Sequence, residues 1–272
     1  MTDGLEHNPA DMTATVAGEM TIAALQARLA KNGQWLPLDP PAPEWLTVAE
    51  ALARDISGPR RCGYGPIRDF TIGLKAVLAD GRVIHSGGKV VKNVAGYDLL
   101  KLFIGARGSL GPIVEAAFKL RPLPECEEFV KRTCASLAEA GALLEAVLES
   151  PLEPAVLDLH SPAVLVLGLA GPREDVDWQL SRARALGFSE PANLDYEKNF
   201  WNGEAQKISV LPSRLIETIS GLGGVAFVAR AANGIIYCRG ALNMPKADVP
   251  VSLMRRVKEA FDPSGLLPAL PI

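Results

Sequence analysis

Apolar and polar positions alternate over short distances in the first part of the chain, and this pattern predicts small elements. The alternation over residues 14–17 predicts a short strand. An apolar stripe with helical spacing follows over 22–29, and the hydroxyl of Thr21 can cap that helix. A second short helix is expected over 48–54. The first 13 residues are polar, so we expect them to be disordered.

A β pattern replaces the helical one at Thr71. Apolar residues alternate over 74–78, and Asp80-Gly81 predicts a two-residue type I′ turn into a return strand. Residues 113–120 show a further strand pattern, and proline and charged residues then crowd into 122–128. Because segments of this composition commonly join domains, we expect a domain boundary there.

Helical and strand patterns take turns beyond this boundary. Ser136 and Glu139 have the spacing of a capping box that opens a helix. The other expected elements are strands at 155–159, 163–169, 207–211, 225–229 and 234–239, and helices near 173–186, after a cap at Ser213, and over 249–261. This order favours an antiparallel sheet packed against helices, so we predict an α+β protein.

Four segments are expected along the chain. A disordered start (1–13) precedes a first domain over 14–125, and a second α+β domain with an antiparallel sheet spans 126–245. Residues 246–272 are expected to form a C-terminal helix and tail that return to the first domain.

The composition excludes several classes of function. With 28 Lys+Arg against 31 Asp+Glu, the chain has a net charge of -3, which argues against a nucleic-acid-binding face. An apolar content of 48% is sufficient for a buried core, but the longest apolar run, near residues 163–170, is too short to span a bilayer. The N-terminus lacks the basic and apolar regions of a signal peptide, so we expect a cytoplasmic protein.

The cysteines and histidines do not form a metal-binding pattern. The four cysteines, at positions 62, 126, 134 and 238, include no C-x-x-C pair, and the three histidines lie far apart in the sequence. Zinc sites and iron–sulfur clusters need such ligands at short, fixed spacings. We therefore expect no metal site in this chain.

Glycine is concentrated in three segments of the first domain, at 58–65, 87–88 and 105–111. Glycine lets backbone amides approach an anion or a flat ring closely. Between short strands, the three segments together predict a domain that wraps a large cofactor. The segment 105–111 lacks G-x-G-x-x-G spacing and leads into a strand, which excludes a Rossmann fingerprint.

Several motifs in this region resemble one family. The segment SGPRR at 57–61, followed by YGPIRDFTIG at 64–73, resembles the FAD-linked oxidases of the vanillyl-alcohol oxidase type. KNVAGYDL at 92–99 and GSLGPIVE at 108–115 extend the resemblance in the same order. With QWLPLDPP at 34–41, this run is most similar to the FAD-binding E subunits of bacterial glycolate oxidases. The resemblance is dense over 14–124 and returns at FDPSG, residues 261–265.

The resemblance implies a fold, a cofactor and a reaction. The fold would be the second lobe of a PCMH-type FAD-binding domain, truncated at its N-terminus, with a cap domain that covers the flavin. The cofactor would be FAD, and the reaction would be oxidation of glycolate, or another small 2-hydroxy acid, with electrons passing through the flavin. The residues expected along the cofactor are Ser57, Gly58, Pro59, Tyr64, Gly65, Asp69, Gly73, Gly108, Ser109, Leu110, Gly111, Ile113 and Val114.

The resemblance also implies partners. These are a D-type flavoprotein subunit, which resembles this fold, and an F-type subunit that carries the iron–sulfur clusters. The absence of cluster-type cysteines here is compatible with that division of roles. We expect the chain to be peripheral to the inner membrane only through such partners.

Two departures from the family leave alternatives open. The Gly-rich lobe that holds the FAD diphosphate lies before the point where this chain begins. Where the family has adjacent glycines, this chain has Ala49 and Glu50, and a carboxylate there would repel a diphosphate. One alternative is therefore a degenerate assembly subunit that no longer binds FAD, and another is a start codon placed too far downstream.

No catalytic residue is assigned from the sequence. Lys89, Lys92 and Tyr97 have groups that suit a carboxylate substrate. We favour the alternative, in which Lys92-Asn93 and Tyr97-Asp98 brace a turn and cap the following helix.

Overall fold

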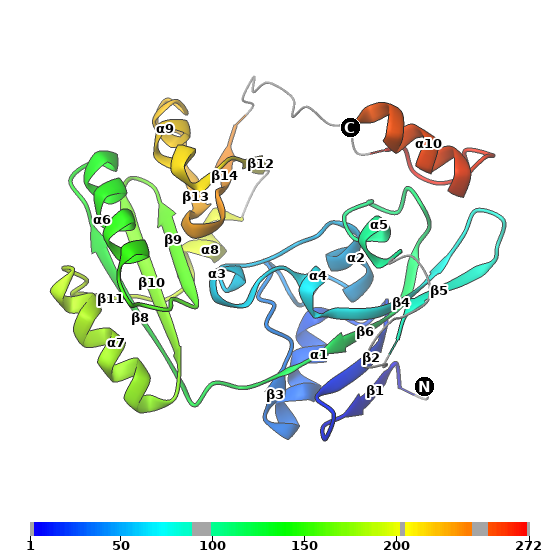
Figure 1. Cartoon of the computed structure of the whole chain (residues 1–272), viewed down its shortest axis with the longest axis horizontal. Helices are drawn as coiled ribbons and strands as arrows, with labels where there is room; N and C mark the ends of the chain where they lie inside the picture. The colour runs from blue at the N-terminus through cyan, green and yellow to red at the C-terminus, as the bar shows by residue number, and fades with distance from the viewer. Residues whose placement is uncertain (1–2, 89–98, 202–204, 241–249, 271–272) are drawn as a thin grey trace. The chain divides into compact units, whose positions relative to one another are not determined.

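The computed structural model describes residues 3–88, 99–201, 205–240 and 250–270 (Figure 1). The chain forms two compact units. Unit 1 comprises Met1–Gly58, Pro66–Leu123 and Lys246–Ile272, and unit 2 comprises Pro59–Gly65 and Pro124–Pro245. The short segment Pro59–Gly65 belongs to unit 2 because Gly63 N donates to Ala155 O at 3.1 Å and Arg60 forms an ion pair with Glu127.

Unit 1 is built around a five-stranded antiparallel sheet in the order β1-β2-β6-β4-β5. The strands are β1 (Leu5–Asn8), β2 (Thr13–Ala17), β4 (Thr71–Val77), β5 (Val83–Gly87) and β6 (Ile113–Lys119). Val16, Ala116 and Leu74 are paired across neighbouring strands and are buried on the core face. The prediction of a disordered start is wrong for β1, because Leu5–Asn8 pair with β2. This pairing uses backbone hydrogen bonds, which do not require apolar side chains.

Short helices complete unit 1. They are α1 (Ile22–Leu29), α2 (Val48–Ala53), α4 (Ile67–Phe70), α5 (Leu100–Phe103) and α10 (Val251–Phe261), with the 3-10 turn η1 (Ala30–Asn32) and a small sheet of β3 (Gln34–Trp35) and β7 (Arg121–Pro122). The predicted cap at Thr21 is confirmed, because its side chain accepts from Ala24 N. Ile22, Leu25 and Leu29 are buried along one side of α1, as their spacing predicts.

The hairpin between β4 and β5 differs from the predicted type I′ turn. Gly81 N donates to Leu78 O, which closes a turn with Asp80 in its third position. Gly81 has φ +82°, whereas Asp80 does not have a positive φ, which a type I′ turn requires at both central residues. The positive φ therefore falls on Gly81, the last residue of the turn, and not on its two central residues.

Unit 2 is built around a seven-stranded antiparallel sheet in the order β11-β8-β10-β9-β13-β14-β12. The strands are β8 (Cys126–Thr133), β9 (Val156–His160), β10 (Val164–Gly171), β11 (Glu190–Pro191), β12 (Ala205–Ser209), β13 (Phe227–Arg230) and β14 (Ile235–Arg239). The helices are α3 (Arg61–Tyr64), α6 (Leu137–Glu149), α7 (Arg173–Ala185), α8 (Asp195–Phe200) and α9 (Leu215–Ser220), with 3-10 turns η2 (Pro212–Arg214) and η3 (Ala231–Asn233). The predicted α+β class is confirmed.

The core of unit 2 lies between one face of the sheet and α6, α7 and α9, and Figure 1 shows α6 and α7 on the same side. Alternate residues of β9, among them Leu157 and Leu159, point into this core. Ser136 caps α6 as predicted by accepting from Glu139 N, although the carboxylate of Glu139 accepts from Ala135 N. The predicted cap at Ser213 is wrong, because η2 precedes α9 and no side chain caps that helix.

Candidate functional site

The glycine-rich segment after α5 forms a tight loop, which we call loop 105–111. Gly105 and Gly108 adopt φ +84° and +77°. The loop is tied to the end of α2, because Gly105 N donates to Leu52 O at 3.0 Å and Arg107 N to Ala53 O at 2.7 Å. A Cβ on Gly111 would lie 2.3 Å from the carbonyl oxygen of Val77, so only glycine fits there.

A cavity of about 280 Å³ lies beside this loop. Its walls include Gly105, Ser109 and Leu110 from the loop, and Met254 and Val257 from α10. Ser109 is 1% exposed, and its buried hydroxyl has no hydrogen-bond partner among the residues that the structure describes. A buried hydroxyl without a partner is costly, so the site suits a ligand with an apolar surface and one polar group.

Ser57 and Gly58 follow α2 in the same unit. Ser57 is buried, and a Cβ on Gly58 would lie 1.8 Å from the backbone oxygen of Asp39. Gly58 is thus required for close packing of the chain on itself.

Gly73 lies on β4 in the floor of a shallow hollow of about 170 Å³, together with Gly87 and Ala117. Gly73 pairs with Ala117 of β6 and with Gly87 of β5, and these small residues leave the sheet surface open. An ion pair of 2.8 Å between Lys75 and Glu115 lies at the edge of the hollow.

The structure brings together some of the predicted cofactor residues. Ser57, Gly58, Gly73 and residues 108–114 all belong to unit 1, where Ile113 is buried on β6 and Val114 is 42% exposed. Asp69 also belongs to unit 1 but is exposed on α4. Pro59, Tyr64 and Gly65 belong to unit 2. Lys89, Lys92 and Tyr97 lie outside the described residues.

The N-terminus of α2, where Ala49 and Glu50 replace the glycines of the family, is closed by internal hydrogen bonds. Thr47 N donates to Glu50 Oε2 at 3.0 Å, and Glu50 N donates to the Thr47 hydroxyl at 3.2 Å. Val48 N and Ala49 N donate to the carbonyls of Met20 and Gly18. Hydrogen bonds from the Thr47 amide and hydroxyl hold the pKa of Glu50 below its usual range. These four amides therefore already have acceptors.

Unit 2 contains a cluster of buried charges that the sequence analysis missed. Arg230 of β13 donates to Asp158 of β9 at 2.5 Å and to both carboxylate oxygens of Glu197 on α8 at 2.7 and 2.8 Å. Tyr196 donates to Asp158 at 2.7 Å, and Trp201 donates to Glu197 at 2.8 Å. We call these five residues the Arg230 cluster.

The cluster contains one cation for two carboxylates. Asp158 and Arg230 are 0% and 1% exposed. Burial, and then the nearby charge of Glu197, raise the pKa of Asp158 to about 7, although Arg230 and Tyr196 oppose the shift. Burial and the adjacent Asp158 likewise raise the pKa of the Cys62 thiol to about 12, which makes it unreactive. The cluster can therefore hold a proton near neutral pH.

A pattern in the sequence could have revealed this cluster. In Leu157-Asp158-Leu159-His160 the apolar residues face the helices, so Asp158 and His160 lie on the other face of the sheet. The same alternation places Arg230 and Tyr237 on that face. His160 stacks on Tyr196 with ring centroids 4.6 Å apart.

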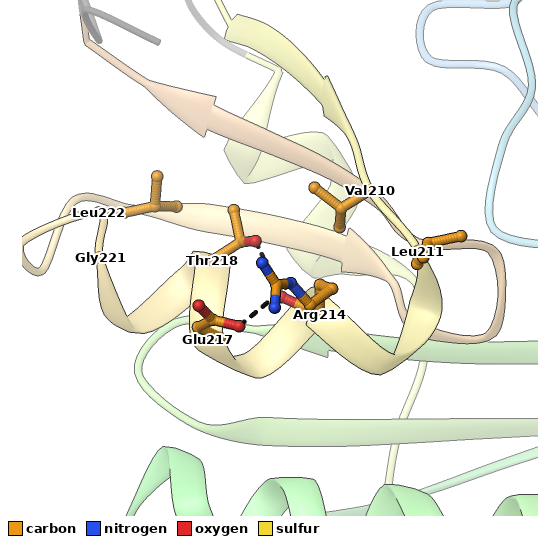
Figure 2. Close-up of a pocket in the computed structure, with 7 residues that line it drawn as sticks. All are labelled: Val210, Leu211, Arg214, Glu217, Thr218, Gly221 and Leu222. Carbon is orange, nitrogen blue, oxygen red and sulfur yellow. Dashed lines mark hydrogen bonds and ion pairs between the residues drawn. The ribbon is translucent and has the colours of Figure 1, made fainter. Parts of the chain in front are cut away.

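A groove of about 410 Å³ lies on the surface of unit 2 beside α9 (Figure 2). Leu211 at its edge is 70% exposed, and Arg214 forms an exposed 3.2 Å ion pair with Glu217. The groove contains no buried charged group, so we assign no chemistry to it.

Among the described residues there is neither a metal-binding cluster nor a helix that could span a membrane. Residues 3–88, 99–201, 205–240 and 250–270 contain no group of three or more His, Cys, Asp or Glu side chains placed to bind a metal ion. Across the same ranges, every helix is too short or too polar to cross a membrane.

Comparison with known proteins shows what the first part of the chain is similar to. Residues 1–87 match the family model of the FAD binding domain. The chain is related to the FAD-linked oxidases. FAD is the cofactor that this match assigns to the chain. This chain is 36% identical over 165 residues to glycolate oxidase subunit GlcD of Bacillus subtilis. The alignment covers 60% of this chain and 35% of that protein.

Two further proteins are similar to part of this chain. Glycolate oxidase subunit GlcE of Escherichia coli is 34% identical over 151 residues, which cover 55% of this chain and 42% of that protein. D-lactate dehydrogenase of Archaeoglobus fulgidus is 37% identical over 118 residues, which cover 43% of this chain and 26% of that protein. The alignments thus span less than half the length of each of these three relatives.

The fold has counterparts among solved structures. Alkyldihydroxyacetonephosphate synthase superimposes on 96% of this chain with a TM-score of 0.71, and the match covers 65% of that protein. The two share 16% sequence identity, so this likeness establishes the fold alone.

The residues of unit 1 fit an FAD in one place and not in another. The mostly apolar cavity beside the glycine loop, with the buried hydroxyl of Ser109 behind its wall, fits the apolar ring of a nucleotide. The N-terminus of α2 does not fit a diphosphate, because its amides have acceptors and Glu50 adds a negative charge.

Proposed function

We propose that the chain is the FAD-binding subunit of a glycolate-oxidase-like complex that oxidises a small 2-hydroxy acid. The observation that carries this proposal is the match of residues 1–87 to the FAD binding domain, next to a loop with an unpartnered buried hydroxyl. Relatives named as glycolate oxidase subunits and as D-lactate dehydrogenase support a 2-hydroxy acid as substrate. Glycolate, oxidised to glyoxylate, is the substrate we propose.

In this proposal, loop 105–111 holds the nucleotide part of FAD. Ser109 offers a hydroxyl to the nucleotide, and Gly105 and Gly108 keep the loop surface free of side chains. When bound, FAD supplies the chemistry by accepting a hydride from the carbon that bears the substrate hydroxyl. Gly58, Gly73, Ile113 and Val114 stay predicted cofactor residues, as do Ser57, Asp69, Leu110 and Gly111, and Pro59, Tyr64 and Gly65 of unit 2.

We further propose that the chain works with a D-type flavoprotein subunit and an F-type iron–sulfur subunit. The similarity to both GlcD and GlcE, two different glycolate oxidase subunits, supports a complex of related chains. A cytoplasmic location, with contact to the inner membrane only through partners, belongs to the same proposal.

The experiment is a titration of the purified chain with FAD, followed by the fluorescence of the flavin. The wild-type chain is expected to bind, and Ser109→Ala is expected to bind about five- to tenfold more weakly, because one hydrogen bond is lost. Ser220→Ala, which removes an exposed hydroxyl from α9, is the matched control and should bind like the wild type. Equal affinity of all three proteins would remove Ser109 from the site.

One observation favours a second candidate function, an assembly subunit that has lost FAD. The closed N-terminus of α2 leaves no amide there for a diphosphate. This candidate predicts that the wild-type chain binds no FAD in the titration, even in the presence of its partner subunits.

A further inference from the structure

Lys258 of α10 reaches the backbone of loop 105–111, a contact between residues 149 positions apart. Its Nζ donates to the carbonyl oxygen of Ser109 at 2.9 Å and to that of Leu267 at 3.3 Å, and it forms an ion pair with Asp262. An ammonium group has three hydrogens, so these three acceptors satisfy it completely. Its side chain is 15% exposed.

Asp262 is fixed in turn by the backbone that follows it. Leu266 N donates to one oxygen of its carboxylate and Leu267 N to the other, both at 2.9 Å. The hydrogen bond from Lys258, assisted by these two amides, lowers the pKa of Asp262 to about 2, so the carboxylate is charged near neutral pH. We call Lys258, Asp262 and the backbone groups that they bind the Lys258 clamp.

The clamp links α10 to the loop by hydrogen bonds, whereas the apolar packing of this helix is loose. None of the 11 residues of α10 is buried, and Leu253 is 55% exposed. Met254 and Val257 line the cavity of about 280 Å³ together with residues of the loop. An edge contact between Phe261 and Phe103, with centroids 5.7 Å apart, adds to the clamp on this side.

The clamp acts on the residue that faces the cavity. Lys258 binds the carbonyl of Ser109, a residue that lines the cavity and whose buried hydroxyl has no partner among the described residues. Moving this carbonyl would therefore move the hydroxyl. The charged hydrogen bond is also stronger than the bonds within the loop, such as Gly111 N to Gly108 O at 3.2 Å.

We propose that Lys258 and Asp262 are positioning residues that hold loop 105–111 in the conformation that binds the FAD nucleotide. The C-terminal helix then sets the affinity of a site formed by the glycine loop. This inference rests on the proposed function, in which the loop binds FAD.

The test combines hydrogen exchange of the FAD-free chain with FAD titration. Lys258→Met is expected to accelerate amide exchange in residues 105–111 and to weaken FAD binding, each by about tenfold, because one charged hydrogen bond is lost. Lys258→Arg keeps the charge and should bring both the exchange rates and the FAD affinity part of the way back to wild-type values. Arg255→Met, which removes an exposed cation from the same helix, should leave both at wild-type values.

Each outcome decides the proposal. Unchanged exchange in the loop, or unchanged FAD affinity when exchange is faster, would overturn it. If Lys258→Met does not fold, Asp262→Asn replaces it, with the same expected direction in both measurements. If the wild-type chain binds no FAD, the proposed function fails, and the affinity part of this inference fails with it, whereas the exchange data still show whether the clamp holds the loop.

Discussion

Arg230 and Glu197 form a two-pronged ion pair inside unit 2, with Nη1 to Oε1 at 2.7 Å and Nη2 to Oε2 at 2.8 Å. Nη1 also binds Asp158, so one guanidinium holds two buried carboxyl groups, although its single charge neutralises only one of them. The planar fork of arginine suits this task, which the single point charge of a lysine would not perform equally well.

Replacing Arg230 is expected to destabilise unit 2 severely. Arg230→Met leaves Asp158 and Glu197 buried without a counter-charge, which costs about 3–5 kcal/mol in the free energy of unfolding. Urea denaturation followed by tryptophan fluorescence measures this loss. Arg214→Met, which breaks an exposed ion pair with Glu217, is the control and should cost less than about 1 kcal/mol. Equal effects of the two substitutions would contradict the account.

Asp158 is expected to make the stability of unit 2 depend on pH. Its pKa is about 7 in the folded chain against 3.8 ordinarily, so the folded state holds a proton that the unfolded state has released. The wild type therefore loses stability as pH rises from about 4 to about 7, by up to about 1.4 kcal/mol per pH unit. Asp158→Asn keeps an oxygen for Arg230 and Tyr196 but has no proton to lose.

The measurement is the difference in unfolding free energy between Asp158→Asn and wild type, at pH 5 and at pH 8. Using the difference cancels other carboxylates, such as Asp262, whose lowered pKa acts in the opposite direction. The variant should gain stability relative to the wild type at the higher pH. A difference that is constant, or that falls with pH, would show that Asp158 is ionised throughout.

Gly58→Ala is expected to prevent the native packing of unit 1. Its Cβ would lie 1.8 Å from the Asp39 carbonyl oxygen and 2.3 Å from a carboxylate oxygen of the same residue, and backbone cannot move aside cheaply. Thermal unfolding should occur at a much lower temperature than in the wild type. Gly221→Ala, whose Cβ would make ordinary contacts of 3.4 Å or more, is the control. A Gly58→Ala protein as stable as this control would refute the close packing.

Local signals in the sequence predict the local structure well. The Thr21 cap, the buried stripe of α1 and the Ser136 cap each depend on residues within one or two turns, and all three are confirmed. Asp80-Gly81 predicts a turn but not its type, because a longer turn also needs a glycine with positive φ. The polar strand β1 was missed because its hydrogen bonds to β2 use backbone groups.

In the candidate site, too, local features could be predicted and long-range contacts could not. Glycine spacing indicates loop 105–111, since its conformation depends on adjacent residues. The Lys258 clamp and the Arg230 cluster join residues 149 and 72 positions apart, and only the tertiary fold pairs them. The alternation of Asp158 and His160 with leucines indicates a polar face but not its partner on β13.

The central claim is that this chain holds an FAD that a 2-hydroxy acid can reduce. The most direct test is the visible absorption spectrum of the chain, purified with its partner subunits, loaded with FAD, desalted and mixed with glycolate without oxygen. The account predicts a retained flavin spectrum that bleaches on addition of glycolate, and a weaker spectrum when Ser109→Ala replaces the wild-type chain. If the partner subunits showed the same flavin content and the same bleaching without this chain, the claim would be contradicted.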